Sequence, residues 1–317
     1  MTPTATLPIV CPGVESSGDP SETTFIDEPY DEYFGGLFLI DRFALTDRLD
    51  LEGQIRGDYH TENREDWSAS ASAIYSLDPD KYHNLRFSAA KAFRVPSIAI
   101  RKTVKSSLGG LFNVLPLQEN FRNEQIWSLE AGYTGKFHKN ITLHLNSYFQ
   151  RLVDMLGPVN TIVGPVTNSI FDNVGDADAY GAEAELTYEH QKGKLSAWYA
   201  YNILKTQRYG QGIRAIWPAQ NKYGLTGRLY LPHGWTLNTN YTSHSSIPAY
   251  ENLILDLSEF HRLDLTLAKK IADGKGEIMF GIADLLNETN QPNLDIGEFA
   301  GHETPGRSFF ARLQFNF

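Results

Sequence analysis

The amino-acid sequence predicts an all-β protein, an antiparallel β-barrel that crosses a membrane. Three observations support this prediction: many segments alternate apolar with polar residues, short and long connections alternate along the chain, and long apolar runs are missing. Charged residues make up 21% of the chain and the mean hydropathy is -0.34, and no run approaches the roughly 18 apolar residues of a membrane helix. A sheet in lipid must pair its backbone internally, so spanning strands close into a barrel.

The alternating segments predict strands that are apolar on one face and polar on the other, because side chains of a strand alternate with a period of two. Residues 49–59, 141–149, 182–188 and 262–267 each follow this pattern. The last nine residues, 309–317, follow it too and end on an aromatic residue. Each segment is a weak signal on its own, but their repetition is typical of barrel strands, and 26 glycines and 12% aromatic residues suit tight turns and interfacial aromatic girdles.

The connections form a second regularity. Short polar connections are predicted at residues 45–48, 78–81, 137–140, 190–194, 232–234 and 272–276. Longer ones alternate with them, at 94–123, 154–178, 207–220, 245–259 and 287–307, and only 60–65 is short on that side. Outer-membrane barrels have short periplasmic turns, long extracellular loops and an even number of strands. The present pattern predicts about 13 strands, and an odd number indicates part of a barrel.

Other classes of protein are disfavoured. A net charge of -10 disfavours a nucleic-acid partner. The single cysteine cannot form an internal disulfide. No defined spacing joins His144, Ser196, His244 and His261 into a catalytic group. Two neighbouring residues in the last loop, His302 and Glu303, do not define a metal site. We therefore expect that the protein is not an enzyme and that it holds no cofactor and no metal.

Four elements resemble those of TonB-dependent receptors and occur in the same order. They are KAFRVPS at 91–97, NEQIWSLEAGY at 123–133, NVG at 173–175 followed by YGAEAEL at 180–186, and GIADLLN at 281–287. One departure is Asp284, where the family usually has asparagine. The resemblance implies a barrel of about 22 strands that encloses an N-terminal plug and lies in the outer membrane of a Gram-negative bacterium.

The resemblance also implies a division of the chain. Residues 33–317 correspond to the C-terminal portion of the receptor barrel. Residues 1–32 contain seven acidic residues and no lysine or arginine, and are expected to be a flexible segment or the remnant of a loop. A plug, a TonB box and a signal peptide are not recognised in this sequence, which suggests a truncated, split or misannotated gene.

Candidate ligand-binding residues lie in two of the long loops. Arg101, Lys102 and Lys105 belong to one, and Arg208, Arg214 and Trp217 to the other. Their charges and aromatic ring could hold an anionic, aromatic iron chelate. The alternative is that these are ordinary polar loop residues in contact with lipopolysaccharide.

Other polar and aromatic residues have structural interpretations. The inward carboxylates are expected to pair with arginines of neighbouring strands; the carboxylates are Glu130, Glu183, Glu185 and Asp264, and the arginines Arg56, Arg228, Arg262 and Arg312. Trp198 is expected to point inward and pack against a plug or loop, and Trp235 to belong to an aromatic girdle. The aromatic residues Phe309, Phe315 and Phe317 of the last segment resemble the signal read by the barrel-assembly machinery.

The favoured function is that of an outer-membrane receptor barrel for TonB-dependent uptake of a ferric siderophore or a similar scarce ligand. TonB would act only through a plug that is missing from this chain. The expected partners are outer-membrane lipid, the barrel-assembly machinery and a small-molecule ligand. Two alternatives remain open: a plugless passive pore, and a non-functional truncated product with unpaired strand edges.

Overall fold

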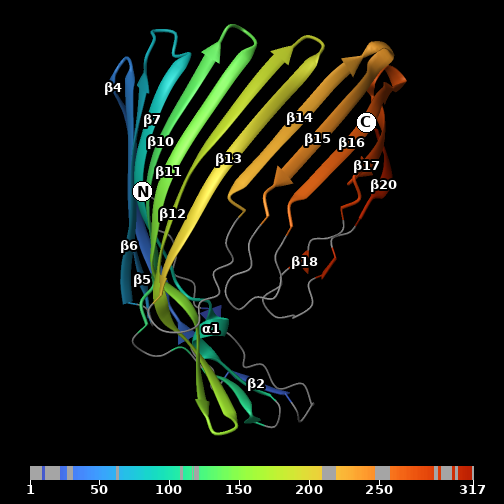
Figure 1. Cartoon of the computed structure of the whole chain (residues 1–317). Coiled ribbons are helices and arrows are strands. Elements are labelled where there is room, and N and C mark those ends of the chain that lie inside the picture. Colours follow the sequence, from blue (N-terminus) through green and yellow to red (C-terminus); the bar gives the residue numbers. More distant parts are fainter. Residues whose placement is uncertain are drawn as a thin grey trace.

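One large antiparallel sheet dominates the computed structural model (Figure 1). The structure describes residues 9–10, 22–26, 31–61, 64–107, 110–115, 117, 121–208, 219–246, 258–288, 292–293, 302–303 and 306–315. The hydrogen-bonded path of the sheet runs β20-β17-β16-β15-β14-β13-β12-β11-β10-β7-β6-β5-β4. These 13 strands confirm the predicted all-β antiparallel architecture. Within the described part of the chain, no helix is long and apolar enough to cross a membrane.

The strands of this path follow one another as neighbours, each hydrogen-bonded to the next along the chain. Their bounds are β4 (Phe34–Thr46), β5 (Leu49–His60), β6 (Arg64–Ser76), β7 (His83–Arg94), β10 (Glu124–Phe137), β11 (Ile141–Val163), β12 (Val166–His190), β13 (Gly193–Arg208), β14 (Asn221–Leu231), β15 (Trp235–His244), β16 (Phe260–Ile271), β17 (Gly276–Ala283) and β20 (Ser308–Phe315).

The register places residues of one kind on one face. Leu129 of β10 lies between Ala89 of β7 and Phe149 of β11, whereas its neighbour Glu130 lies between Ser88 and Tyr148. The first row belongs to an apolar face and the second to a polar face, as the alternation predicts. The apolar face is widely exposed: Leu129 is 58% and Phe87 55% accessible. A solvent-exposed apolar wall of this extent suits lipid rather than water.

Six short turns lie at one end of the sheet, at the top of Figure 1. They include the 3₁₀ turns η2 (Pro232–Gly234) and η3 (Ala272–Gly274), in which Gly234 and Gly274 have φ of 76° and 88°. This left-handed backbone favours glycine. The predicted short connections are therefore confirmed, and the opposite end carries the longer connections.

The β11–β12 hairpin differs from the expected loop at 154–178. The strands continue as an extended hairpin to a two-residue turn at 164–165, with paired residues up to Val163 and Val166. Gly164 has φ of 60° in this turn, and β-branched residues such as Thr161, Ile162 and Thr167 favour the strand conformation. The hairpin extends well beyond its neighbours at the lower end of Figure 1.

Short elements lie outside the main path of the sheet, and three of them, β2 (Glu22–Ile26), β8 (Thr103–Ser107) and β9 (Phe112–Leu115), are joined to this hairpin. β8 pairs with β2 and with β9, which in turn lies parallel to β12. The helix α1 (Ile98–Lys102) precedes β8. β1 (Ile9–Val10) pairs with β3 (Asp31–Glu32), and β18 (Pro292–Asn293) with β19 (His302–Glu303). Residues 9–10, 22–26 and 31–32 of the N-terminal segment thus lie in paired strands.

The sheet is open. β4 and β20 end the hydrogen-bonded path and do not pair with each other in the described part of the chain. Both carry large exposed apolar side chains, including Leu37 at 81% and Phe309 at 73%. The described strands therefore form part of a barrel wall.

Candidate functional site at the long-loop end of the sheet

Three arginines stand at the long-loop end of the sheet, each above a covered carboxylate. Arg94 pairs with Glu124, Arg122 with Asp154 at 2.9 Å, and Arg151 with Asp176 at 3.4 Å. We call Arg94 and Arg122 the arginine rim; Arg151 lies instead in the same row as Trp127, on the apolar face.

Exposure differs sharply within these pairs. The arginine side chains are 75%, 72% and 46% accessible, whereas their partners Glu124, Asp154 and Asp176 are 14%, 10% and 8% accessible. Although each pair is formally neutral, the guanidinium groups face solvent and the carboxylates lie beneath them. The surface offered to a ligand is therefore cationic, and arginine donates in a fork that matches carboxylate or phosphate oxygens.

The side chain of Asn173 holds the base of the rim. Its Oδ1 accepts a hydrogen bond from the backbone N–H of Arg122 at 2.8 Å, and its Nδ2 donates to the backbone carbonyls of Arg122 at 3.0 Å and Asp154 at 2.6 Å. One amide thus joins the segment before β10 to the β11–β12 hairpin. This residue begins the NVG element found in the sequence.

Asp154 lies where the β11–β12 register shifts, between Leu152 and Met155. Its φ is 58°, a left-handed conformation that aspartate tolerates. Its backbone N–H donates to Oδ1 of Asp176 at 3.2 Å, so the carboxylate of Asp176 lies against the backbone of Asp154 at the bulge. Burial raises the pKa of Asp154; Arg122 opposes this effect and the charge of Asp176 adds to it.

Arg101, a predicted ligand-binding residue, is buried. Its Nη1 lies 2.5 Å from Oε1 of Glu32, and its Nε donates to the carbonyl of Pro96 at 2.9 Å. The other carboxylate oxygen of Glu32 lies 3.6 Å from Nε2 of His60. In this arrangement Arg101 connects α1 with the N-terminal segment. Only 4% of its side chain is accessible.

The other predicted ligand-binding residues are placed only in part. Lys102 ends α1 and is half-buried. The backbone of Lys105 pairs with Thr24 and Val114, and Arg208 ends β13 opposite Gly175; the side chains of these two residues are outside the described part. Arg214, Trp217 and Phe317 lie outside the described residues. Within the described part of the chain, side-chain surroundings are shown for Arg101 and Lys102 alone, so the grouping of the six residues stays a prediction.

The polar face below the rim has fewer ion pairs between strands than expected. Arg56 and Arg262 pair with Asp58 and Asp264 of their own strands, at 2.6 and 2.9 Å. Arg312 pairs with Glu277 of the neighbouring strand at 3.1 Å, as expected, although that carboxylate was not among those named. Three of the four remaining predicted groups bond to neutral partners: Arg228 to Asn238, Glu185 to Ser196, and Glu130 to Ser88. The fourth, Glu183, lies opposite Asn146 and Ala200 in the register.

Trp198 points to the polar face, as predicted, but its neighbour is on the adjacent strand. A Cβ atom at Gly224 would lie 2.5 Å from its Nε1, so the indole lies over a glycine. Trp235 lies on the apolar face beside Leu267 and Lys269, whose Nζ is 5.1 Å from the indole centre. This position fits the predicted girdle.

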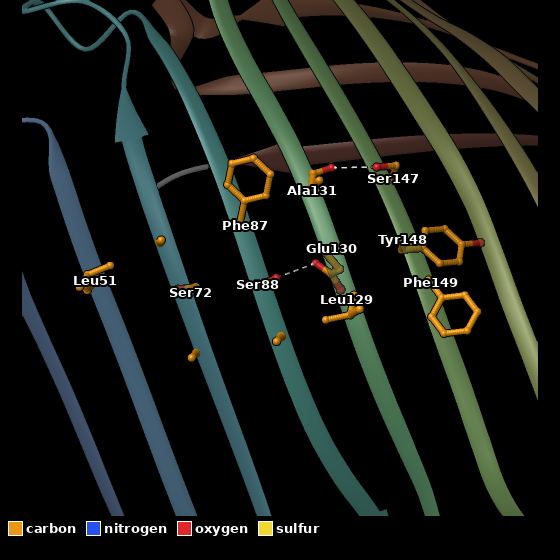
Figure 2. Close-up of a pocket in the computed structure, with 13 residues that line it drawn as sticks. Leu51, Ser72, Phe87, Ser88, Leu129, Glu130, Ala131, Ser147, Tyr148 and Phe149 are labelled. Atoms are coloured by element: carbon orange, nitrogen blue, oxygen red, sulfur yellow. Dashed lines mark hydrogen bonds between the residues drawn. The ribbon is translucent and has the colours of Figure 1, made fainter.

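Figure 2 looks onto the apolar face, where a hollow of about 680 Å³ opens between β5, β6, β7, β10 and β11. Phe87, Leu129 and Phe149 stand toward the viewer, whereas Glu130 and Tyr148 are seen through the ribbon, with distant strands behind them. The polar face thus lines the concave side of the wall. The hollow itself faces outward.

This combination of an exposed apolar outer wall, a polar concave face, and short turns opposite long connections defines a membrane β-barrel protein with a cationic surface at its long-loop end. Comparison with known proteins identifies the family. The model of the TonB dependent receptor-like beta-barrel matches residues 9–283. The chain belongs to this family, whose barrels are outer-membrane proteins and whose members are receptors and transporters rather than enzymes.

Solved structures share the fold. The siderophore receptor PirA of Acinetobacter baumannii superposes with a TM-score of 0.71 at 13% identity, over 90% of this chain and 46% of that one. The ferric enterobactin receptor PfeA of Pseudomonas aeruginosa superposes with a TM-score of 0.71 at 15% identity, over 91% of this chain and 45% of that receptor. The outer-membrane transporter YddB of Escherichia coli superposes with a TM-score of 0.72 at 11% identity, over 93% of this chain and 47% of that transporter. This chain therefore spans less than half of these proteins. A search of curated proteins found no match.

The arginine rim was not predicted from the sequence. Arg94 and Arg122 adjoin elements that carry the family resemblance, at 91–97 and 123–133. That proximity was an available signal. The pairing with Asp154, 32 residues further on, depends on the bulge in β11, which alternation does not reveal.

Proposed function

We propose that this chain is the barrel portion of an outer-membrane receptor that imports an anionic ferric chelate, a ferric siderophore, in a TonB-dependent manner. Residues 33–317 form the barrel wall in this proposal. The wall is completed by further strands, and TonB acts through a plug that these strands enclose. The open edges at β4 and β20, and the coverage of less than half of PirA and PfeA, support this view.

The observation that carries the proposal is the asymmetric exposure of the arginine rim. The side chains of Arg94 and Arg122 are 75% and 72% accessible at the end that bears the long connections, while Glu124 and Asp154 are covered. An anionic ligand arriving from outside meets cations first. Such a surface concentrates anions and raises their association rate.

Binding of ferric enterobactin, the ligand named for PfeA, tests the proposal. The receptor is extracted from outer membranes in mild detergent, and binding is followed by quenching of tryptophan fluorescence. Arg94→Gln and Arg122→Gln should each weaken binding about tenfold, the loss expected for one charge-assisted hydrogen bond. Arg312→Gln, beside a short turn, is the matched control and should bind normally.

Heat-modifiable migration on gels shows whether each variant is folded. Equal affinities in the folded Arg94→Gln, Arg122→Gln and parent proteins would refute a role of the rim in binding. No saturable binding by the parent protein would refute ferric enterobactin as a representative of the ligand class.

A further inference from the structure

The hollow on the apolar face is floored by small side chains. Ala71, Ala73, Ala89 and Ala131 lie between the taller Phe87, Leu129 and Phe149. Ser147 also contributes to the floor, but its hydroxyl donates to the carbonyl of Ala131 at 3.3 Å (Figure 2). The polar group is thus satisfied within the wall. What remains is an apolar channel between aromatic and aliphatic ridges.

A second hollow of about 450 Å³ continues the first toward the long-loop end. The two share Ala71, Ala89, Leu129 and Phe149. The second is bordered by Trp67 and Trp127, whose ring centroids are 6.1 Å apart at 83°. Tryptophan at this depth is typical of the boundary between lipid tails and headgroups.

Charges begin in the row of Trp127 itself. Lys91 of β7 belongs to this row and is buried in an ion pair with Asp66 at 3.1 Å, and further charges follow on β11, β12 and β13. Leu129, Phe149, Tyr180 and Ile203 form the last apolar row, and Trp127, Arg151, Asp178 and Lys205 form the next row on the same face. Arg151 is 46% accessible and Asp178 25%, with 3.9 Å between their charged atoms. Lys205 is exposed beside them. Two accessible cations therefore flank Asp178, and Arg151 also pairs with the covered carboxylate of Asp176 at 3.4 Å.

We infer that this wall binds an anionic, phosphate-bearing lipid of the outer leaflet, with an acyl chain in the alanine-floored channel and a phosphate on Arg151 and Lys205. The inference rests on the membrane placement in the proposed function. The two connected hollows follow the strands, are lined by apolar side chains and end at cations. This shape and charge match an anionic amphiphile that lies parallel to the strands. Arginine and lysine are the usual ligands of phosphate, and lysine or arginine at a membrane surface favours anionic lipid.

Native mass spectrometry of the receptor, purified from outer membranes and incubated with phosphatidylglycerol or with zwitterionic phosphatidylcholine, tests the inference. The parent protein should retain phosphatidylglycerol in preference. Arg151→Gln and Lys205→Gln should each lower its retention about fivefold, the effect expected of one cation at a charged membrane surface. Arg228→Gln, on the polar face, is the control for charge and should retain the parent level.

The channel is tested separately by filling it. Ala89→Phe should reduce retention of both lipids, whereas Ala197→Phe, on the apolar face of β13, should not. Equal retention by Arg151→Gln and the parent, or by Ala89→Phe and Ala197→Phe, would overturn the inference, provided that heat-modifiable migration shows folded protein. Because Lys205→Gln and Ala89→Phe leave all the rim arginines unchanged, binding of ferric enterobactin by these two variants should stay normal, so a failure here is distinguishable from failure of the proposed function.

Discussion

Replacing Asn173 by alanine should release the segment before β10 from the β11–β12 hairpin. The side chain makes three hydrogen bonds, at 2.8, 3.0 and 2.6 Å, to backbone groups of Arg122 and Asp154. At about 1 kcal/mol net for each bond, the local loss is about 3 kcal/mol, and two carbonyls and one N–H lose partners. Because Arg122 would lose its anchor, its distance from Asp154 should become variable.

Hydrogen–deuterium exchange on the receptor in detergent measures this release directly. A loss of about 3 kcal/mol corresponds to an exchange rate of the Arg122 amide that is higher by about two powers of ten. Asn160→Ala, at an exposed position of the same hairpin, is the control and should leave that amide protected. If Asn173→Ala exchanges at the parent rate, the three contacts do not hold the rim, and the reasoning fails.

Three further predictions concern titration, packing and assembly. Asp154→Asn should flatten the pH dependence of stability. Burial raises the pKa of the Asp154 carboxyl in the folded protein above 3.8, so the parent loses stability as the pH rises from that value through the folded pKa. Thermal unfolding measured across this pH range checks the prediction. Gly224→Val should cost about 1–3 kcal/mol by displacing Trp198, whereas Gly53→Ala, with open space at its Cβ position, should unfold at a denaturant concentration closer to that of the parent. Phe317→Asp should reduce the heat-modifiable receptor in outer membranes without lowering total expression; a parent-like gel pattern would contradict this.

The wall of the barrel could be predicted because one rule governs it. In β10, alternation alone assigns Leu129 to the outside and Glu130 to the inside, and the register confirms both. The short turns could also be predicted, because glycine at positions such as 234 and 274 favours the left-handed backbone that these turns contain.

The hairpin and the rim could not be predicted in the same way. Alternation does not say where a strand leaves the membrane, so residues 154–178 read as a loop although they continue in strands. Arg101 looked available because its partner Glu32 lies 69 residues earlier, and only the fold brings them to 2.5 Å. Ligand-facing charges at long connections depend on such distant pairings.

The most direct test of the receptor proposal is uptake of radiolabelled iron from ferric enterobactin by cells that carry or lack the gene. The proposal predicts that deletion lowers uptake, that the parent gene restores it, that Arg94→Gln with Arg122→Gln restores it poorly, and that a protonophore abolishes it. Uptake that is unchanged by deletion, or that persists after the protonophore, would contradict an energised receptor; persistence would instead indicate a passive pore.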